Sequence, residues 1–170
     1  MIKLPRLNPL TLAKKIPNQR LSKTVMNTFL NVGVPFNAGL GLSVEELSAE
    51  RVRIYSPPRW KRRNHLGGAH ACAIAVLVEV PAGLMVLQKY PLEKYRFILG
   101  GLTITYHKQG RGPLYGEVSP PQEWPLIVDN GEIWVEFQTK VTNKDGELVA
   151  EGHTKWQIKP WSTVKSNARK

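Results

Sequence analysis

The spacing of hydrophobic residues along the chain predicts an ordered series of helices and strands. Apolar residues recur at helical spacing over residues 22–34, where Ser22 is a suitable N-cap, so we expect a short helix there. Residues 42–47 and 51–56 alternate between apolar and polar side chains, which indicates two strands. The first third of the chain is therefore expected to form a helix followed by a strand pair.

A long apolar run over residues 69–89 predicts a single helix that is hydrophobic on most sides. Its most apolar part, residues 71–87, would be about 25 Å long as a helix, short of the roughly 30 Å hydrocarbon core of a membrane. The run also carries Glu79 and Pro81 near its centre, and a charge there is rare in a membrane span. We therefore expect the core helix of a folded domain rather than a membrane span.

The rest of the chain has the alternation and the turn signals of a sheet. Asp145-Gly146 is a strong hairpin signal between the last two apolar runs. An antiparallel sheet needs one covered apolar face, and the 69–89 helix is the element apolar enough to cover it. We therefore expect an α+β fold in which the sheet curls around that helix. The predicted strands cover residues 97–107, 112–119, 132–142 and 148–158.

The elements together indicate one domain over residues 22–160, which fits a chain of 170 residues. The preceding residues, 1–21, are basic and contain prolines, so we expect a loosely held arm there. Residues 161–170 form a short C-terminal tail. Both ends are candidates for contact with membrane phosphates.

The chain is strongly basic, with 24 Lys and Arg against 13 Asp and Glu and a net charge of +11. Such a charge favours anionic partners, namely phosphorylated cofactors, nucleic acid or a lipid surface. The single cysteine, Cys72, excludes a disulfide framework within the chain and fits a reducing compartment. The first residues lack a long apolar run with a cleavage site, so we expect no signal peptide and a cytoplasmic protein. The four histidines and one cysteine show no metal-ligand spacing.

The polar loop that leads into the long helix contains the best candidates for chemistry. Asn64 and His70 lie in this loop, and Glu79 interrupts the apolar run that follows. A lone carboxylate among Ile, Val, Leu and Ala is costly to bury unless it is paired or protonated. Glu79 is therefore a candidate site residue, whereas pairing with a basic residue of a neighbouring strand would give it a structural role.

The loop and the predicted architecture resemble the hotdog-fold thioesterase superfamily, in particular the phenylacetate-pathway type and a related uncharacterised subfamily. In that type an Asn lies six residues before a His, and an acidic residue lies nine after it. Asn64, His70 and Glu79 match both spacings. Residues 140–152 resemble the last hairpin of the family, so the resemblance covers roughly residues 36–158.

Three positions depart from the pattern of that type. His70-Ala71-Cys72 stands where the type has His-Gly-Gly, and Glu79 stands where it often has Asp. The loss of the glycines matters little if their backbone amides carry out the chemistry, and more if a substrate passes where Cys72 projects. From its apolar context we expect Cys72 to be a small buried residue rather than a nucleophile.

The spacing of His70 and Glu79 predicts that the two side chains of one chain do not meet. Nine residues along a helix correspond to about 900° of rotation and roughly 13 Å of rise. The residues would meet if two chains paired about a two-fold axis. The resemblance implies the same arrangement, because hotdog enzymes are usually dimers with sites at the interface. We therefore expect a homodimer and leave open whether dimers pair into tetramers.

The resemblance also implies hydrolysis of an acyl-CoA thioester. Free N–H groups at the helix start, chiefly that of Ala71, would polarise the carbonyl with help from the helix dipole. Glu79 would act as general base or nucleophile, Asn64 would orient the water or the carboxylate, and His70 would fix the loop or support the carbonyl. Coenzyme A would enter as part of the substrate, with no separate cofactor. The basic residues expected to hold its phosphates are Arg59, Lys61, Arg62 and Arg63.

Each candidate residue also has a structural interpretation. Asn64 is a typical turn former, His70 a typical loop anchor, and the basic run a typical solvated loop. For the whole protein, the main alternative is a non-catalytic acyl or acyl-CoA binding module that has lost turnover. A nucleic-acid binder, motivated by the net charge and by Trp60, is less favoured because the cations are spread along the chain. A dehydratase or hydratase on the same fold is weaker still, since nothing in the sequence points to it.

Overall fold

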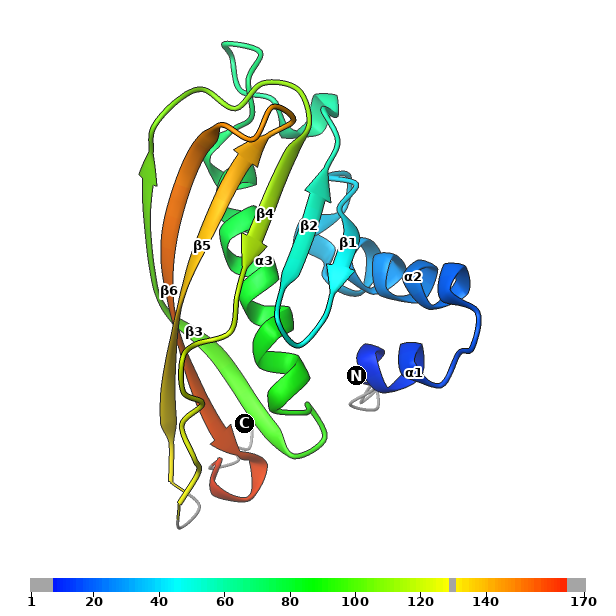
Figure 1. Cartoon of the computed structure of the whole chain (residues 1–170), viewed down its shortest axis with the longest axis vertical. Coiled ribbons are helices and arrows are strands. Elements are labelled where there is room, and N and C mark those ends of the chain that lie inside the picture. The colour runs from blue at the N-terminus through cyan, green and yellow to red at the C-terminus, as the bar shows by residue number, and fades with distance from the viewer. Residues whose placement is uncertain (1–7, 129–130, 165–170) are drawn as a thin grey trace, which may run out of the picture.

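The computed structural model describes residues 8–128 and 131–164, and within them six strands form one antiparallel sheet (Figure 1). The strand order is β1-β2-β4-β5-β6-β3, so that β1 and β3 are the two edges. The predicted strands are confirmed, with small shifts at their ends. Their bounds are β1 (Ser43–Leu47), β2 (Val52–Ser56), β3 (Tyr95–Tyr106), β4 (Leu114–Val118), β5 (Ile133–Asn143) and β6 (Leu148–Pro160).

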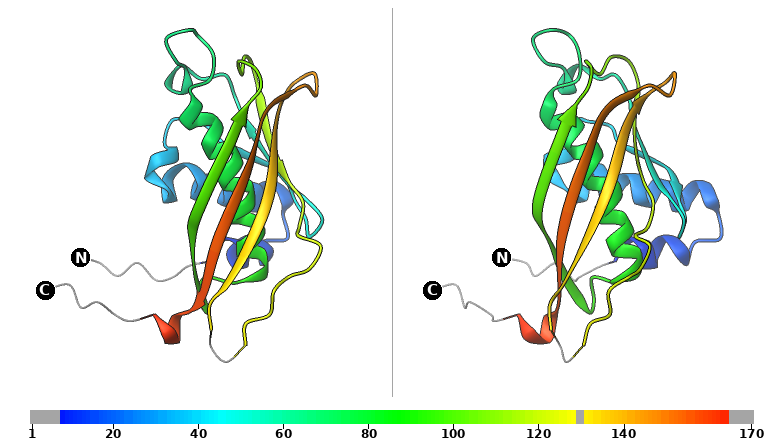
Figure 2. Two further views of the ribbon diagram at one scale, coloured as in Figure 1. Left: turned by 90° about the vertical axis from the view of Figure 1, so that its left-hand side faces the viewer. Right: turned by 60° about the vertical axis from the view of Figure 1, so that its left-hand side comes forward.

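The sheet curls around one long helix, α3 (Ala71–Lys89), which lies along its inner face (Figures 1 and 2). Leu77 and Val78 of this helix are fully buried, as are inward-facing residues of the sheet such as Val141 and Ile158. The expected α+β fold, with one apolar helix inside an antiparallel sheet, is confirmed. By length and composition α3 could cross a membrane, but most of it is buried as the core helix of the domain.

Near its middle, α3 makes a close backbone contact with the sheet. Pro81 has no N–H, so the carbonyl of Leu77 lacks its usual partner in the helix. The backbone of Gly116 in β4 lies directly against that carbonyl oxygen, where a Cβ atom would overlap with it. The glycine therefore allows the helix to approach the strand closely at the point where a helical hydrogen bond is missing.

Part of the expected N-terminal arm is a helix packed on the domain. Helix α1 (Pro9–Lys14) is capped by the side chain of Asn8, which accepts the N–H of Leu10. Leu10 and Ala13 are buried in the hydrophobic core. The expectation of a loosely held arm is therefore wrong for this segment, while residues 1–7 lie outside the described residues.

The next helix, α2 (Gln19–Thr28), begins before the predicted N-cap, Ser22, because the side chain of Asn18 caps its first backbone N–H groups. A π-helical turn, Phe29–Gly33, and a 3-10 turn, Pro35–Asn37, follow. Residues of both turns line a pocket against α3.

The start of the expected C-terminal tail is also ordered. Trp161–Thr163 form a short helical turn, and the indole N–H of Trp161 donates to the carbonyl of Leu92 at 2.7 Å. Residues 165–170 lie outside the described residues.

Candidate functional site

Helix α3 begins at a histidine cap. The backbone of His70 is extended, and its Nδ1 atom accepts the backbone N–H of Cys72 at 3.1 Å. The carbonyl oxygen of His70 accepts the N–H groups of Ala73 and Ile74 at 2.9 and 3.1 Å. Because Nδ1 is an acceptor, the neutral ring carries its proton on Nε2. The loop-fixing role of His70 therefore has a defined geometry.

One backbone N–H at this end of α3 is unused. In the described part of the chain, the N–H of Ala71 has no hydrogen-bond acceptor, whereas the N–H groups of Cys72 and Ala73 are both bonded. The carbonyl of the same residue is used: the hydroxyl of Tyr106 in β3 donates to it at 3.2 Å and links the first turn of the helix to the edge strand. An unused N–H at the positive end of a helix can stabilise negative charge on a carbonyl oxygen.

The side chain of Asn64 is used within its own loop. Its Oδ1 atom accepts the N–H groups of Leu66 and Gly68 at 3.0 and 3.1 Å, and its amide group donates to the carbonyl of Ala69 at 3.3 Å. Between them, Gly67 has a φ of 75°, a conformation that favours glycine. These bonds favour the turn-forming role of Asn64 over a direct action on water or on a carboxylate.

Glu79 is half-buried and unpaired. Among residues 8–128 and 131–164, no group forms a hydrogen bond or an ion pair with its carboxylate. Burial raises the pKa of this carboxyl above its ordinary value. Glu79 lines a pocket of about 360 Å³ whose other walls are mainly apolar, with Gly83, Leu87 and Trp156 among them. The basic partner that a structural role would need is therefore not found in the described part of the chain.

A second pocket, also of about 360 Å³, lies at the start of α3. It is lined by two basic side chains, Lys61 and Arg62, by two aromatic rings and by the helix cap. Phe36 lines this pocket and the Glu79 pocket alike, so the two adjoin. The lining residues of the second pocket include Phe36, Trp60, Lys61, His70 and Cys72.

The two pockets divide the candidate site within one chain. His70 lies in the pocket at the helix start, and Glu79 lies in the apolar one, as their spacing along the helix predicted. Cys72 and Glu79, by contrast, share a helix face, because seven residues make about 700° of rotation and roughly 10 Å of rise. Because of this rise along the helix, a carbonyl bound at the Ala71 N–H would be too far from the Glu79 carboxylate of the same chain.

The basic run before the loop consists of one buried and three exposed side chains. Arg62 is only 3% exposed, and its guanidinium donates to the carbonyl and hydroxyl oxygens of Ser56 at 3.1 and 3.0 Å and to the carbonyl of Gly112. Burial lowers its pKa. Arg62 therefore links β2 to the segment before β4, and the fold uses its guanidinium in these bonds; that it binds phosphate stays a prediction. The side chains that stay exposed are Arg59, Lys61 and Arg63.

The expectation that Cys72 is buried is also wrong, since its side chain is exposed. The first turn of α3 is covered on one side only, so Ala73 and Ile74 are buried while Cys72 faces away from the core. Phe36 and Tyr106 carry no signal in the sequence, because tertiary packing alone brings them to the helix start. In the described part of the chain, no group of three His, Cys, Asp or Glu residues could hold a metal ion.

Similarity to known proteins agrees with this architecture. The structure is similar to that of a protein of unknown function and probable thioesterase from Pseudomonas aeruginosa, with a TM-score of 0.68, 21% identity and coverage of 81% of this chain and 95% of that one. A putative thioesterase from Shewanella oneidensis gives a TM-score of 0.68 at 15% identity, with coverage of 84% and 100%. At these identities the likeness shows the fold alone.

No curated protein matches the chain. Residues 22–158 match the family described as a domain of unknown function, DUF4442. This match spans most of the chain and coincides with the domain that contains the sheet, α3 and both pockets. The chain therefore belongs to the DUF4442 family and has the hotdog fold.

Proposed function

We propose that the protein is an acyl-CoA thioesterase in which Glu79 is the catalytic carboxylate. The observation that carries the proposal is the state of this residue: a half-buried carboxylate with no partner in the described part of the chain, in a mainly apolar pocket. An unpaired buried charge lowers stability, so its presence favours a chemical role. The likeness of the fold to proteins named as probable or putative thioesterases supports the same class of reaction.

The proposed reaction needs one carboxylate and one hydrogen-bond donor. Glu79 takes a proton from water while the water oxygen bonds to the thioester carbonyl carbon. The N–H of Ala71 of the partner subunit stabilises the negative charge on the carbonyl oxygen. The C–S bond then breaks, and the proton passes from Glu79 to the leaving thiolate, which gives a carboxylic acid and a thiol. Direct attack by Glu79, followed by hydrolysis of the anhydride, gives the same products.

A homodimer is part of the proposal, and the edge strand β3 supports it. Three large side chains of β3 are well exposed: Ile98 (47%), Leu102 (40%) and Tyr106 (47%). A second copy on this edge would cover them and pair the free backbone groups of the strand. Because Tyr106 also contacts Ala71, such a dimer would bring the helix start of each chain close to the interface.

The pocket at the helix start is the proposed site for the coenzyme A part of the substrate. Lys61 and Trp60 line it, and Arg59 and Arg63 are exposed beside them. Cationic side chains of this kind bind phosphates, and an indole ring stacks on a base. The acyl chain would lie in the adjoining apolar pocket that contains Glu79.

A non-catalytic acyl-CoA binding protein is the second candidate, and Cys72 favours it. The side chain of Cys72 lines the pocket at the helix start, at a position that is glycine in the related enzyme type. If this side chain blocks the approach of the thioester to the Ala71 N–H, the pockets would bind a substrate without turning it over.

The deciding experiment measures thiol release and acyl-CoA binding in parallel over a panel of acyl-CoA esters. Glu79→Gln keeps the side-chain size and removes the charge, so thiol release should fall by about a hundred- to ten-thousandfold while binding persists. Glu50→Gln, which neutralises an exposed carboxylate in the β1–β2 turn, is the matched control and should leave both unchanged. Binding without turnover by the native protein would favour the second candidate, and the absence of both would refute the two together.

A further inference from the structure

We propose that the protein docks on anionic lipid bilayers through an exposed surface near the start of α3, here called the docking rim. Phe36 from one segment and Trp60 and Lys61 from another line the pocket at the helix start, and further exposed apolar and basic residues flank them in the sequence. This proposal does not depend on the thioesterase activity. The residues of the docking rim are Val32, Phe36, Arg59, Trp60, Lys61, Arg63 and Leu66.

The apolar part of the docking rim is unusually exposed. Trp60 is 80% exposed, Phe36 73%, Val32 70% and Leu66 63%. Single exposed apolar residues are common on protein surfaces, but here two aromatic rings line the same pocket mouth. A tryptophan beside aliphatic and basic residues is the composition that favours the membrane–water interface.

The charged part of the docking rim has no counter-charge. Arg59, Lys61 and Arg63 form no ion pair with any acidic residue in the described part of the chain. The side chains of Arg59 and Lys61 pack on Gly41 and Gly39, respectively, where a Cβ atom would overlap with them. These contacts place both side chains against the loop that follows Phe36: the stem of Lys61 lies on Gly39 and the guanidinium of Arg59 on Gly41, while both residues remain exposed.

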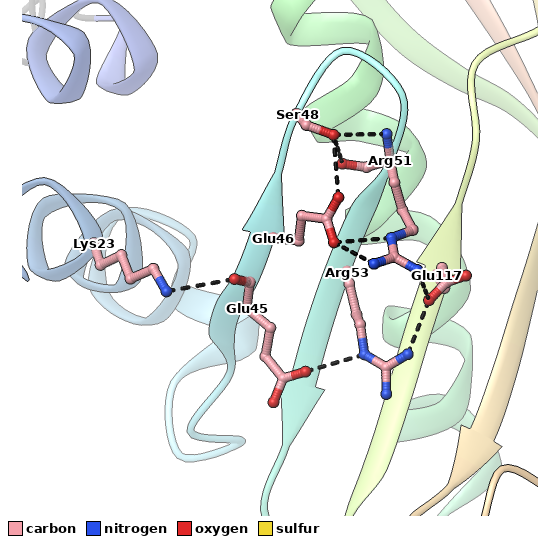
Figure 3. A network of polar contacts seen from close by, with 7 residues as sticks. All are labelled: Lys23, Glu45, Glu46, Ser48, Arg51, Arg53 and Glu117. Atoms are coloured by element: carbon pink, nitrogen blue, oxygen red, sulfur yellow. Dashed lines mark hydrogen bonds and ion pairs between the residues drawn. The ribbon is translucent and has the colours of Figure 1, made fainter. Parts of the chain in front are cut away.

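The arginines on the outer face of the sheet, by contrast, are paired with carboxylates (Figure 3). Arg53 contacts Glu45 at 3.0 Å and Glu117 at 2.9 Å, and Arg51 contacts Glu46. Charge there is largely compensated and contributes little to binding an anionic surface. The cations of the docking rim have no acidic partner of this kind and can contact lipid phosphates.

Two other partners fit this surface less well. A second copy of the chain, paired through the rim about a two-fold axis, would bring like charges together. A single-stranded nucleic acid would stack on Trp60 and Phe36 but would gain nothing from the exposed aliphatic side chains of Val32 and Leu66. A bilayer accepts aromatic, aliphatic and basic groups at once. Docking would also place Phe36, which lines both pockets, against the lipid.

Co-sedimentation of the full chain with lipid vesicles tests the proposal. We expect binding to vesicles that contain phosphatidylglycerol, weak binding to pure phosphatidylcholine, and loss of binding at high salt. Replacing Arg59, Lys61 and Arg63 by Gln should weaken partition into anionic vesicles roughly a hundredfold. The matched control replaces three exposed cations elsewhere, Arg20, Lys94 and Lys140, by Gln and should weaken it much less.

The apolar residues are tested in the same assay. Phe36→Ser with Trp60→Ser should reduce binding to anionic vesicles, whereas Leu126→Ser with Val128→Ser, at 79% and 66% exposed sites elsewhere, should not. Thermal unfolding checks that each variant folds. As a measurement that needs no destabilising change, vesicles should shift the tryptophan emission of the native protein to the blue, and Trp60→Phe should remove that shift.

Several outcomes would overturn the proposal. Equal losses in the two triple-Gln variants would mean that net charge alone drives binding. Unchanged binding after Phe36→Ser with Trp60→Ser would remove the docking rim from the interface. A halved molecular mass of that variant in solution would identify the rim as a surface between two copies. Binding to a single-stranded oligonucleotide, but not to vesicles, would identify a nucleic-acid partner instead.

Discussion

The Nδ1 atom of His70 accepts the backbone N–H of Cys72 at 3.1 Å, and this bond makes His70 the N-cap of α3. His70→Ala removes the cap and should lower the free energy of unfolding by about 1 kcal/mol. His70→Asn supplies another capping side chain and should restore most of that loss. Urea unfolding of the three proteins measures the effect, and equal stability of the Ala and Asn variants would contradict it.

The same pair of variants separates the two roles of His70 in thiol release. If the residue acts through the cap alone, as the hydrogen bond favours, His70→Asn should restore turnover along with stability. Restored stability with low turnover would instead assign a direct role to the Nε2–H donor. Binding of acyl-CoA, measured in parallel, shows whether any loss lies in kcat or in KM.

Glu79 should lower the stability of the protein at neutral pH. Burial raises its pKa, so any stabilisation by its neutral form is complete below the unfolded-state pKa and is lost as the pH rises through the folded-state pKa. Glu79→Gln should therefore raise the free energy of unfolding at neutral pH, and the difference should shrink in acid. Urea unfolding at several pH values checks this, with Glu50→Gln as the control. A destabilising effect at neutral pH would reveal a favourable partner and support a structural role.

The raised pKa of Glu79 also predicts the acid limb of the activity profile. The proposed base must be ionised, so kcat should fall as the pH drops through this pKa, at a higher pH than for an ordinary carboxyl group. The measurement is thiol release at saturating substrate over a range of pH. An acid limb in the ordinary carboxyl range would mean that a different, more exposed group controls the reaction.

Gly116→Ala should be among the more damaging single changes in the fold. Its Cβ atom would overlap with the carbonyl oxygen of Leu77, and neither backbone can move freely. We expect a loss of about 1–3 kcal/mol in the free energy of unfolding. Gly101→Ala in β3, where the added Cβ would make an ordinary 3.5 Å contact with Lys155, is the control and should change stability much less.

Alkylation of Cys72 should block the pocket at the helix start. Cys72 is the one cysteine of the sequence and its side chain is exposed, so a bulky maleimide should label the native protein at a single site. After removal of excess reagent, thiol release from acyl-CoA should be slow. Cys72→Ala should stay active before and after the same treatment, and inhibition of this variant would point to modification at another residue.

The elements that could be predicted from the sequence are those with strong local signals. The apolar run of α3 and the Asp145-Gly146 turn, where Gly146 has a φ of 79°, needed no tertiary information. Helix α1 was missed although its signal is present, because Asn8 followed by Pro9 is an N-cap followed by a favoured first helical residue. Its buried face of Leu10 and Ala13 is too short for helical periodicity to show.

The site was harder to predict, because several of its features depend on residues that are distant in the sequence. In the sequence Arg62 looks like its exposed neighbours, and only the fold shows that its guanidinium donates to Ser56 and Gly112. The exposure of Cys72 depends on which side of α3 the sheet covers, and a helix that is apolar all round does not reveal this. The spacing of His70 and Glu79, by contrast, was enough to separate them, because helix geometry alone fixes it.

Pro81 has a mechanical consequence for α3. The bond that the Leu77 carbonyl would accept is missing, so the helix resists bending less at this point than elsewhere along its length. The turns before it carry the unused N–H of Ala71 and the carboxylate of Glu79, and core residues lie on both sides of it, with Leu77 and Val78 before and Leu87 after. A change of tilt at Pro81 could therefore shift the Ala71 N–H and the Glu79 carboxylate only if Leu77 and Val78 repacked against the sheet, so the packing of the core sets the position of both groups.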